Sequence, residues 1–169
     1  MTAQIEQLIR ILSEGGVEYV LLGGVAALAH GSAMVTFDVD VCYRRDRQNV
    51  ARLCGALRPF HPALRGAPAD LPFVLDPPTV LTGLNFTLAT DIGEIDLLGE
   101  VAGLGEYFEV EAQSVVAELY GLRVRVLSLE GLIRSKKAAG RPKDLTHLVE
   151  LEALQEMQQN RKSASSDGL

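Results

Sequence analysis

The feature that most constrains the fold is a strand-like stretch with two aspartates, TFDVDVCY, at residues 36–43. Side chains of a β-strand alternate between the two faces of a sheet. Asp38 and Asp40 therefore share one face with Cys42. The opposite face is apolar, and we expect it in the core: Phe37, Val39 and Val41. A lone D-x-D pair is more often a solvated strand face, so its meaning depends on the rest of the chain.

A second pair of carboxylates lies in the strand-like stretch GEIDLLG, residues 93–99, where Glu94 and Asp96 share one face. If the two strands are neighbours, three or four carboxylates converge. Such a cluster is costly unless a cation neutralises it, and hard carboxylate oxygens suit Mg²⁺ or Mn²⁺. Three aspartates can hold the pair of ions used for in-line phosphoryl displacement. Glu94, at the strand start, could equally be solvated.

A glycine pair, Gly23-Gly24, precedes the D-x-D stretch by fourteen residues, counted from Gly24 to Asp38. It follows an apolar strand-like run, VEYVLL, and opens a short Ala-rich helical segment. Glycine lets backbone N–H groups approach a phosphate, and a helix N-terminus adds a positive dipole. Alone, Gly-Gly is more often a tight turn. Before a D-x-D strand, it favours a phosphate-binding turn.

The remaining patterns predict alternating helices and strands followed by a helical pair. The proline-rich stretch 58–80 holds six of the seven prolines and predicts a loop or edge structure. The other expected elements are a helix ending at Gly15-Gly16, a helix over 44–57, a hairpin of 85–90 with 93–99, two strands around Gly121, a helix from Ser128 to Gly140 and a last helix to about Gln158. The predicted units are a core, 1–127, a helical pair, 128–158, and a disordered tail, 159–169.

Composition narrows the function classes. The 169-residue chain has a net charge of −6, which disfavours binding to duplex nucleic acid such as DNA. Only 5% of its residues are aromatic, so stacking platforms for single strands are scarce. No apolar run approaches the roughly 18 residues of a membrane span, and the N-terminus does not resemble a signal peptide. We expect a cytoplasmic protein with two reduced, buried thiols, Cys42 and Cys54.

Three stretches together resemble the minimal nucleotidyltransferases of the DNA polymerase β-like superfamily: LLGGVAALAHGSAMVTFDVDV, GEIDLLG and LIRSKKAAGRPKDLTHL. The resemblance covers roughly residues 17–44, 93–99 and 128–151. It is greatest to stand-alone bacterial proteins related to abortive-infection nucleotidyltransferase toxins. It implies an α+β fold in which a mixed sheet is flanked by helices, with C-terminal helices.

The resemblance also implies roles for individual residues. Asp38 and Asp40 would hold Mg²⁺ or Mn²⁺, and Asp96 would be the third metal ligand and the base that takes the acceptor proton. The residues expected to bind the nucleoside triphosphate are Gly23, Gly24, Thr36, Lys136, Arg141 and Lys143. Lys136 and Lys137 point about 100° apart on a helix, so we expect only one of them to face a ligand.

Two positions depart from the family pattern. Met34 stands where many relatives have arginine, and His147 stands where many have aspartate. We expect His147 to be exposed, as well as His61 in the proline-rich stretch, and we expect His30 to be structural.

Three functions remain open. The first is metal-dependent transfer of a nucleoside monophosphate from a nucleoside triphosphate to an unknown acceptor, either RNA, a protein or a small molecule. Such an enzyme could be the toxin of a toxin–antitoxin pair with a small cognate protein partner. The second is a weak or inactive protein of the same fold that acts as a nucleotide-binding, antitoxin or regulatory partner, which Met34 motivates. The third is a D-x-D glycosyltransferase, for which the chain is short and lacks a doubly wound βαβ order.

Overall fold

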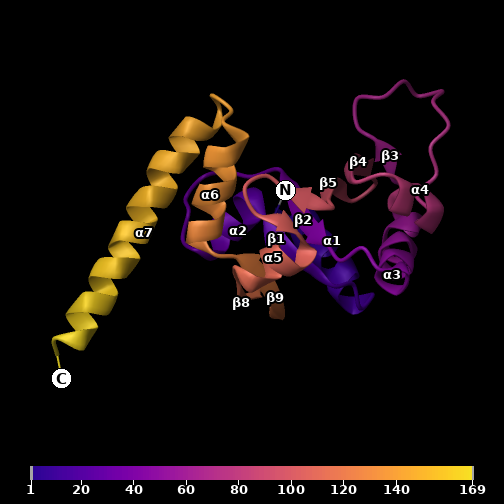
Figure 1. Ribbon diagram of the computed structural model, residues 1–169. Coiled ribbons are helices and arrows are strands. Elements are labelled where there is room, and N and C mark those ends of the chain that lie inside the picture. Colours follow the sequence, from indigo (N-terminus) through magenta and orange to yellow (C-terminus); the bar gives the residue numbers. More distant parts are fainter. Residues whose placement is uncertain (1, 169) are drawn as a thin grey trace.

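The computed structural model describes residues 2–168 (Figure 1). It contains every predicted helix and strand and adds several short elements in the middle of the chain. The first part alternates helices and strands as predicted: α1 (Thr2–Glu14), β1 (Tyr19–Leu22), α2 (Gly23–Ala29), β2 (Asp38–Tyr43) and α3 (Arg47–Leu57). The middle and last parts contain η1 (Arg58–Phe60), β3 (Ala63–Leu64), α4 (Pro77–Thr82), β4 (Asn85–Thr90), β5 (Gly93–Leu98), β6 (Glu100–Val101), β7 (Gly105–Glu106), α5 (Tyr107–Ala112), β8 (Ser114–Leu119), β9 (Leu122–Leu127), α6 (Leu129–Ala139) and α7 (Asp144–Ser166).

Seven strands form one mixed sheet in the order β3-β4-β5-β2-β1-β9-β8. The pairs β2–β5 and β1–β9 are parallel, and the other pairs are antiparallel. Helix α1 packs against β2, β5, β9 and α3, whereas α2 packs against β1, β2 and α6. The expected fold class, a mixed sheet flanked by helices with further helices at the C-terminus, is confirmed. The proline-rich stretch forms the edge of the sheet through β3, also as predicted.

Strand β2 follows the predicted alternation only within the sheet. Val39 and Val41 are fully buried, as expected, and Cys42 is buried as well. The prediction for Phe37 is wrong, because its side chain is 63% exposed. Strand β2 begins at Asp38, so Phe37 precedes the sheet and its side chain is not directed by strand geometry.

Local signals set the ends of α6. The Ser128 hydroxyl accepts a hydrogen bond from the Gly131 N–H at 3.1 Å, and Gly140 ends the helix with a φ of 62°. Both positions match the predicted ones, because an N-cap hydroxyl and a left-handed glycine are strong local boundaries.

The last helix is longer than predicted. Figure 1 shows α7 beside α6, with its C-terminal part extending away from the sheet. Residues 159–166 are helical and exposed rather than disordered, and Leu169 of the predicted tail lies outside the described residues. Neither glycine nor proline interrupts the chain between Pro142 and Gly168, so nothing local stops the helix earlier.

Several smaller predictions can be compared with the structure. Cys42 and Cys54 are free and buried, as expected. His30 is structural, since its Nε2 lies 2.8 Å from the Leu127 carbonyl oxygen. The side chain of His61 is 81% exposed, also as expected. Among residues 2–168, no helix has both the length and the apolar character that crossing a membrane requires.

Candidate metal and nucleotide site

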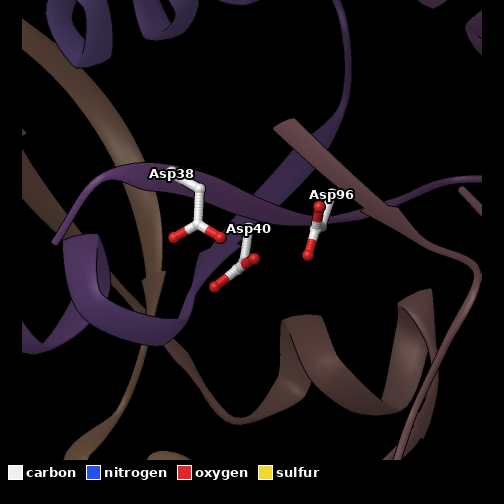
Figure 2. Close-up of side chains that lie close together, drawn as sticks. All are labelled: Asp38, Asp40 and Asp96. Atoms are coloured by element: carbon white, nitrogen blue, oxygen red, sulfur yellow. The ribbon is translucent and has the colours of Figure 1, made fainter. Parts of the chain in front are cut away.

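Three aspartates on two parallel strands form the centre of the candidate site. In the β2–β5 register, Asp40 is opposite Asp96, and Asp38 is opposite Glu94. One carboxylate oxygen from each of Asp38, Asp40 and Asp96 lies within 4.8 Å of the others. Figure 2 shows Asp38 and Asp40 projecting from one strand toward the same region as Asp96. The convergence expected from the alternation of strand side chains is therefore present.

The surroundings of this triad disfavour three negative charges. Burial raises the pKa of Asp40 to about 7, and the neighbouring charges of Asp38 and Asp96 act in the same direction. Burial also raises the pKa of Asp96, although Arg65 opposes this effect. A group of close, partly buried carboxylate oxygens is the donor set that Mg²⁺ or Mn²⁺ prefers. The residues present therefore fit a divalent cation.

The two glycines are required by the close approach of other side chains. Gly23 has a φ of +56°, and a Cβ there would overlap the Asp40 carboxylate. A Cβ on Gly24 would lie 2.5 Å from the Thr36 hydroxyl oxygen. That hydroxyl donates a hydrogen bond to the Asp38 carbonyl oxygen at 3.3 Å. The glycine pair thus allows the first turn of α2 to lie directly against the triad.

A cavity of about 640 Å³ opens from the triad toward α6 and α7. The structure brings every predicted site residue to its wall, including those far apart in the sequence. These residues are Gly23, Gly24, Thr36, Asp38, Asp40, Asp96, Lys136, Arg141 and Lys143. Met34, one of the two departures from the family pattern, lies on the same wall.

Lys136 is the buried cation of this cavity. Its side chain is 14% exposed, and its Nζ lies 3.2 Å from Asp144 Oδ1. Asp144 also accepts a 2.8 Å hydrogen bond from Arg141 Nε, and these hydrogen bonds from Arg141 and Lys136 lower its pKa despite burial. Lys137 instead pairs with Glu152 at 3.0 Å and is 59% exposed. The prediction that only one of the two lysines faces the site is confirmed.

The prediction that His147 is exposed is wrong. The side chain is half-buried on the cavity wall, and its Nδ1 lies 3.2 Å from Lys136 Nζ. Its position one turn after Lys143 places it against α6, because α6 and α7 pack side by side. Lys136 is therefore held by two groups from α7, Asp144 and His147.

The sequence analysis missed one residue of this site, Arg65. It follows the edge strand β3, and its guanidinium forms ion pairs with Glu94 at 2.7 Å and with Asp96. It also lies 3.7 Å from Asp38 Oδ2. Glu94, for which a solvated position was also considered, is thus joined to the triad through Arg65. A basic residue in the proline-rich stretch was the only local signal, and local patterns do not pair β3 with the hairpin.

Comparison with known proteins finds similarity in structure but not in sequence. A scan of protein-family models finds no match to this sequence, and a search of curated proteins finds no similar sequence either. Solved structures do match. The antibiotic-resistance factor ANT(2'')-Ia, solved in complex with adenylyl-2''-tobramycin, has a TM-score of 0.58 at 14% identity, covering 98% of this chain and 92% of that one.

Two further structures give the same result. The solution structure of ANT(2'')-Ia has a TM-score of 0.57 at 15% identity, covering 99% of this chain and 95% of that one. A nucleotidyltransferase-like protein from Paracoccidioides brasiliensis has a TM-score of 0.54 at 13% identity, covering 90% and 72% of the two chains. The chain therefore has the nucleotidyltransferase fold.

Proposed function

We propose that the protein is a metal-dependent nucleotidyltransferase that transfers a nucleoside monophosphate from a nucleoside triphosphate to an acceptor. One observation carries the proposal. The Asp38–Asp40–Asp96 triad borders a cavity whose wall also carries the glycine turn and Lys136. Carboxylates for a cation and cations for phosphates are the two halves of a phosphoryl-transfer site.

Asp38, Asp40 and Asp96 would hold Mg²⁺ or Mn²⁺, which supplies charge neutralisation and orientation for the triphosphate when bound. Asp96 would also take the proton of the acceptor hydroxyl as a general base, and burial raises its pKa above the ordinary value of an aspartate. The acceptor oxygen forms a bond to the α-phosphorus, and the bond from that phosphorus to pyrophosphate breaks.

The phosphate-binding groups come from two places in the fold. Lys136, with Arg141 and Lys143, would bind phosphate oxygens from the α6–α7 side of the cavity. The backbone N–H groups of Gly23 and Gly24 would approach the triphosphate from the start of α2, and the Thr36 hydroxyl contacts the chain beside the triad at the Asp38 carbonyl oxygen. His147 and Asp144 position Lys136 through the contacts described above.

For the acceptor, we favour a small molecule. The chain covers nearly all of ANT(2'')-Ia, a protein solved with an adenylylated antibiotic, so no separate acceptor domain is required. The net charge of −6 also weighs against RNA. Transfer to RNA or a protein, as by a cytoplasmic toxin with a cognate protein partner, is the alternative.

Isothermal titration calorimetry with nucleoside triphosphates and Mg²⁺ tests the site directly. We expect the wild-type protein to bind at least one nucleotide in a metal-dependent manner, and the Asp38→Ala/Asp40→Ala variant to lose that binding. Metal-dependent binding that survives the double substitution would show that the triad is not the metal site. Labelled triphosphates with panels of small molecules, RNA and proteins then identify the acceptor.

A second candidate function is a nucleotide-binding partner without catalytic activity, such as an antitoxin or a regulatory subunit. It is favoured by Met34, which lies on the cavity wall where many relatives have arginine. Nucleotide binding without a labelled product from any acceptor or cell extract would support this function over the enzyme.

A further inference from the structure

Arg65 contacts the carboxylates from the β3–β4 edge of the sheet. Its Nη1 lies 2.7 Å from Glu94 Oε2 and 3.7 Å from Asp38 Oδ2, and its Nη2 pairs directly with Asp96 Oδ1. The side chain is 26% exposed, and Arg65 is absent from the cavity wall. One guanidinium thus binds two of the three aspartates that form the proposed metal site.

The register of the sheet explains how a residue of the edge reaches the centre. The Arg65 N–H donates to the Thr87 carbonyl oxygen at 2.9 Å, so Arg65 continues the β3–β4 ladder. Thr87 is opposite Asp96 on β5, and Asp96 is opposite Asp40 on β2. Because Thr87 is small, a long side chain on the edge can cross it and reach Asp96.

A guanidinium and a divalent cation cannot bind the same carboxylate oxygens together, since both are positive and both need those lone pairs. We propose that Arg65 is a positioning residue that competes with the metal ion. It holds Asp38 and Asp96 in the conformation of the structure, and it withdraws toward Glu94 when the cation binds. This inference rests on the metal site of the proposed function.

Three features of the chain allow this withdrawal. Glu94 is 47% exposed and is outside the triad, so it remains as an anchor for Arg65 after the aspartates are released. Arg65 Nε is buried and has no hydrogen-bond partner among the described residues, so this atom does not fix the side chain. Gly66 follows with a φ of +76°, and residues 66–76 form neither helix nor strand.

Competition of this kind lowers the apparent affinity for the metal. When a binding-competent state is populated at about 10%, the apparent affinity falls about tenfold. Removing Arg65 should therefore tighten metal binding, although it removes a favourable ion pair from the metal-free protein. Loss of a residue that merely stabilises the site would have the opposite effect. It would disorder the carboxylate ligands and lower the affinity for the metal ion.

The test is direct Mn²⁺ binding, measured by electron paramagnetic resonance on the full chain without nucleotide at about pH 8, where Asp40 is mainly ionised. We expect Arg65→Ala to bind Mn²⁺ about tenfold more tightly than the wild type, and Arg65→Lys to lie between them, because lysine is shorter and lacks the forked, bidentate donors of a guanidinium. Arg123→Ala, an exposed position on β9 with the same change in charge, should leave the affinity unchanged. In EDTA, Arg65→Ala should have a lower melting temperature than the wild type.

Each outcome separates this inference from the proposed function. Equal or weaker Mn²⁺ binding by a folded Arg65→Ala variant overturns the competition while leaving the metal site in place. Tighter binding by both Arg65→Ala and Arg123→Ala would show a general charge effect and would also overturn it. If neither the wild type nor Arg65→Ala binds Mn²⁺, the metal site of the proposed function fails as well.

Discussion

The groups on the two sides of the Asp38–Asp40–Asp96 triad differ in how they interact with its negative charge. On the α2–α6 side, defined by Gly23, Gly24 and Lys136, the glycine backbone packs closely against Asp40 and Thr36, and Lys136 pairs with Asp144 of α7 rather than with the triad. On the β3–β4 side, defined by Arg65 and Glu94, a cation binds the carboxylates directly. The first side resembles a site prepared for a ligand, and the second supplies the protein's own counter-charge.

The difference shows how a protein can maintain a cluster of close carboxylates. Such a cluster is unstable when fully charged, so it must be protonated, paired or bound to a cation. Here burial raises the pKa of Asp40 to about 7, which favours its protonated form, and Asp96 is paired with Arg65. The following predictions test each side in turn.

The largest effect should come from the pH dependence of stability in EDTA, which depends on Asp40. Its pKa is raised from 3.8 to about 7 in the folded state, so the folded protein binds this proton more tightly than the unfolded chain. The free energy of unfolding should therefore fall as the pH rises from about 4 to about 7, by a total on the order of 4 kcal/mol.

Asp40→Asn is the control for this profile, because the amide keeps the shape and cannot ionise. We expect its stability to change much less across the same pH range in urea denaturation monitored by circular dichroism. Addition of Mg²⁺ should also remove most of the fall in the wild type. Parallel pH profiles for the wild type and Asp40→Asn in EDTA would show that Asp40 does not cause the fall in stability.

The next largest effect on stability concerns the close packing on the α2–α6 side. Gly23→Ala should lower the free energy of unfolding by about 3 kcal/mol, because the new Cβ adds overlap with Asp40 to the penalty for a positive φ. Gly121→Ala is the matched control, since Gly121 has a φ of +74° and open space around its Cβ position. We expect about 1–2 kcal/mol there. Equal losses in chemical denaturation would mean that contact with Asp40 contributes nothing.

A smaller effect separates the two adjacent lysines. Lys136→Ala should weaken the binding of nucleoside triphosphate with Mg²⁺ by about 10- to 100-fold, because a charged hydrogen bond to phosphate is lost. Lys137→Ala removes the same charge from an exposed position paired with Glu152, and we expect less than about a twofold change. Calorimetric titration of both variants measures the difference, and equal effects would leave Lys136 without a specific role.

The smallest effect should come from Glu94, the anchor of Arg65. Glu94→Gln should weaken Mn²⁺ binding by about two- to threefold, since Arg65 then has only the aspartates to bind and exposed ion pairs contribute less than about 1 kcal/mol. In the Arg65→Ala background, the same substitution should have a smaller effect. A double-mutant cycle of the Mn²⁺ affinities measures this coupling, and additive effects would indicate that Glu94 acts only through its own charge.

Local sequence predicted the elements and the faces of the strands well. Backbone geometry within a few residues is decisive for three of these features. They are the alternation in β2 and β5, the glycine pair that opens α2, and the boundaries of α6 at Ser128 and Gly140. Errors of the same local kind arose where an element begins or ends at an unexpected residue, at Phe37 before β2 and at the C-terminal end of α7.

The sequence by itself determined that Asp38 and Asp40 share one face of a strand and that Asp96 shares a face with Glu94 on another. It also determined that a helix with two adjacent lysines follows the strands. Only the tertiary structure decided that β2 and β5 are parallel neighbours with Asp40 opposite Asp96, that His147 holds Lys136 and that Arg65 reaches the triad across β4. Periodicity along the chain reports which face a side chain occupies. The pairing of distant strands depends on packing across the whole core, which no local stretch of residues encodes.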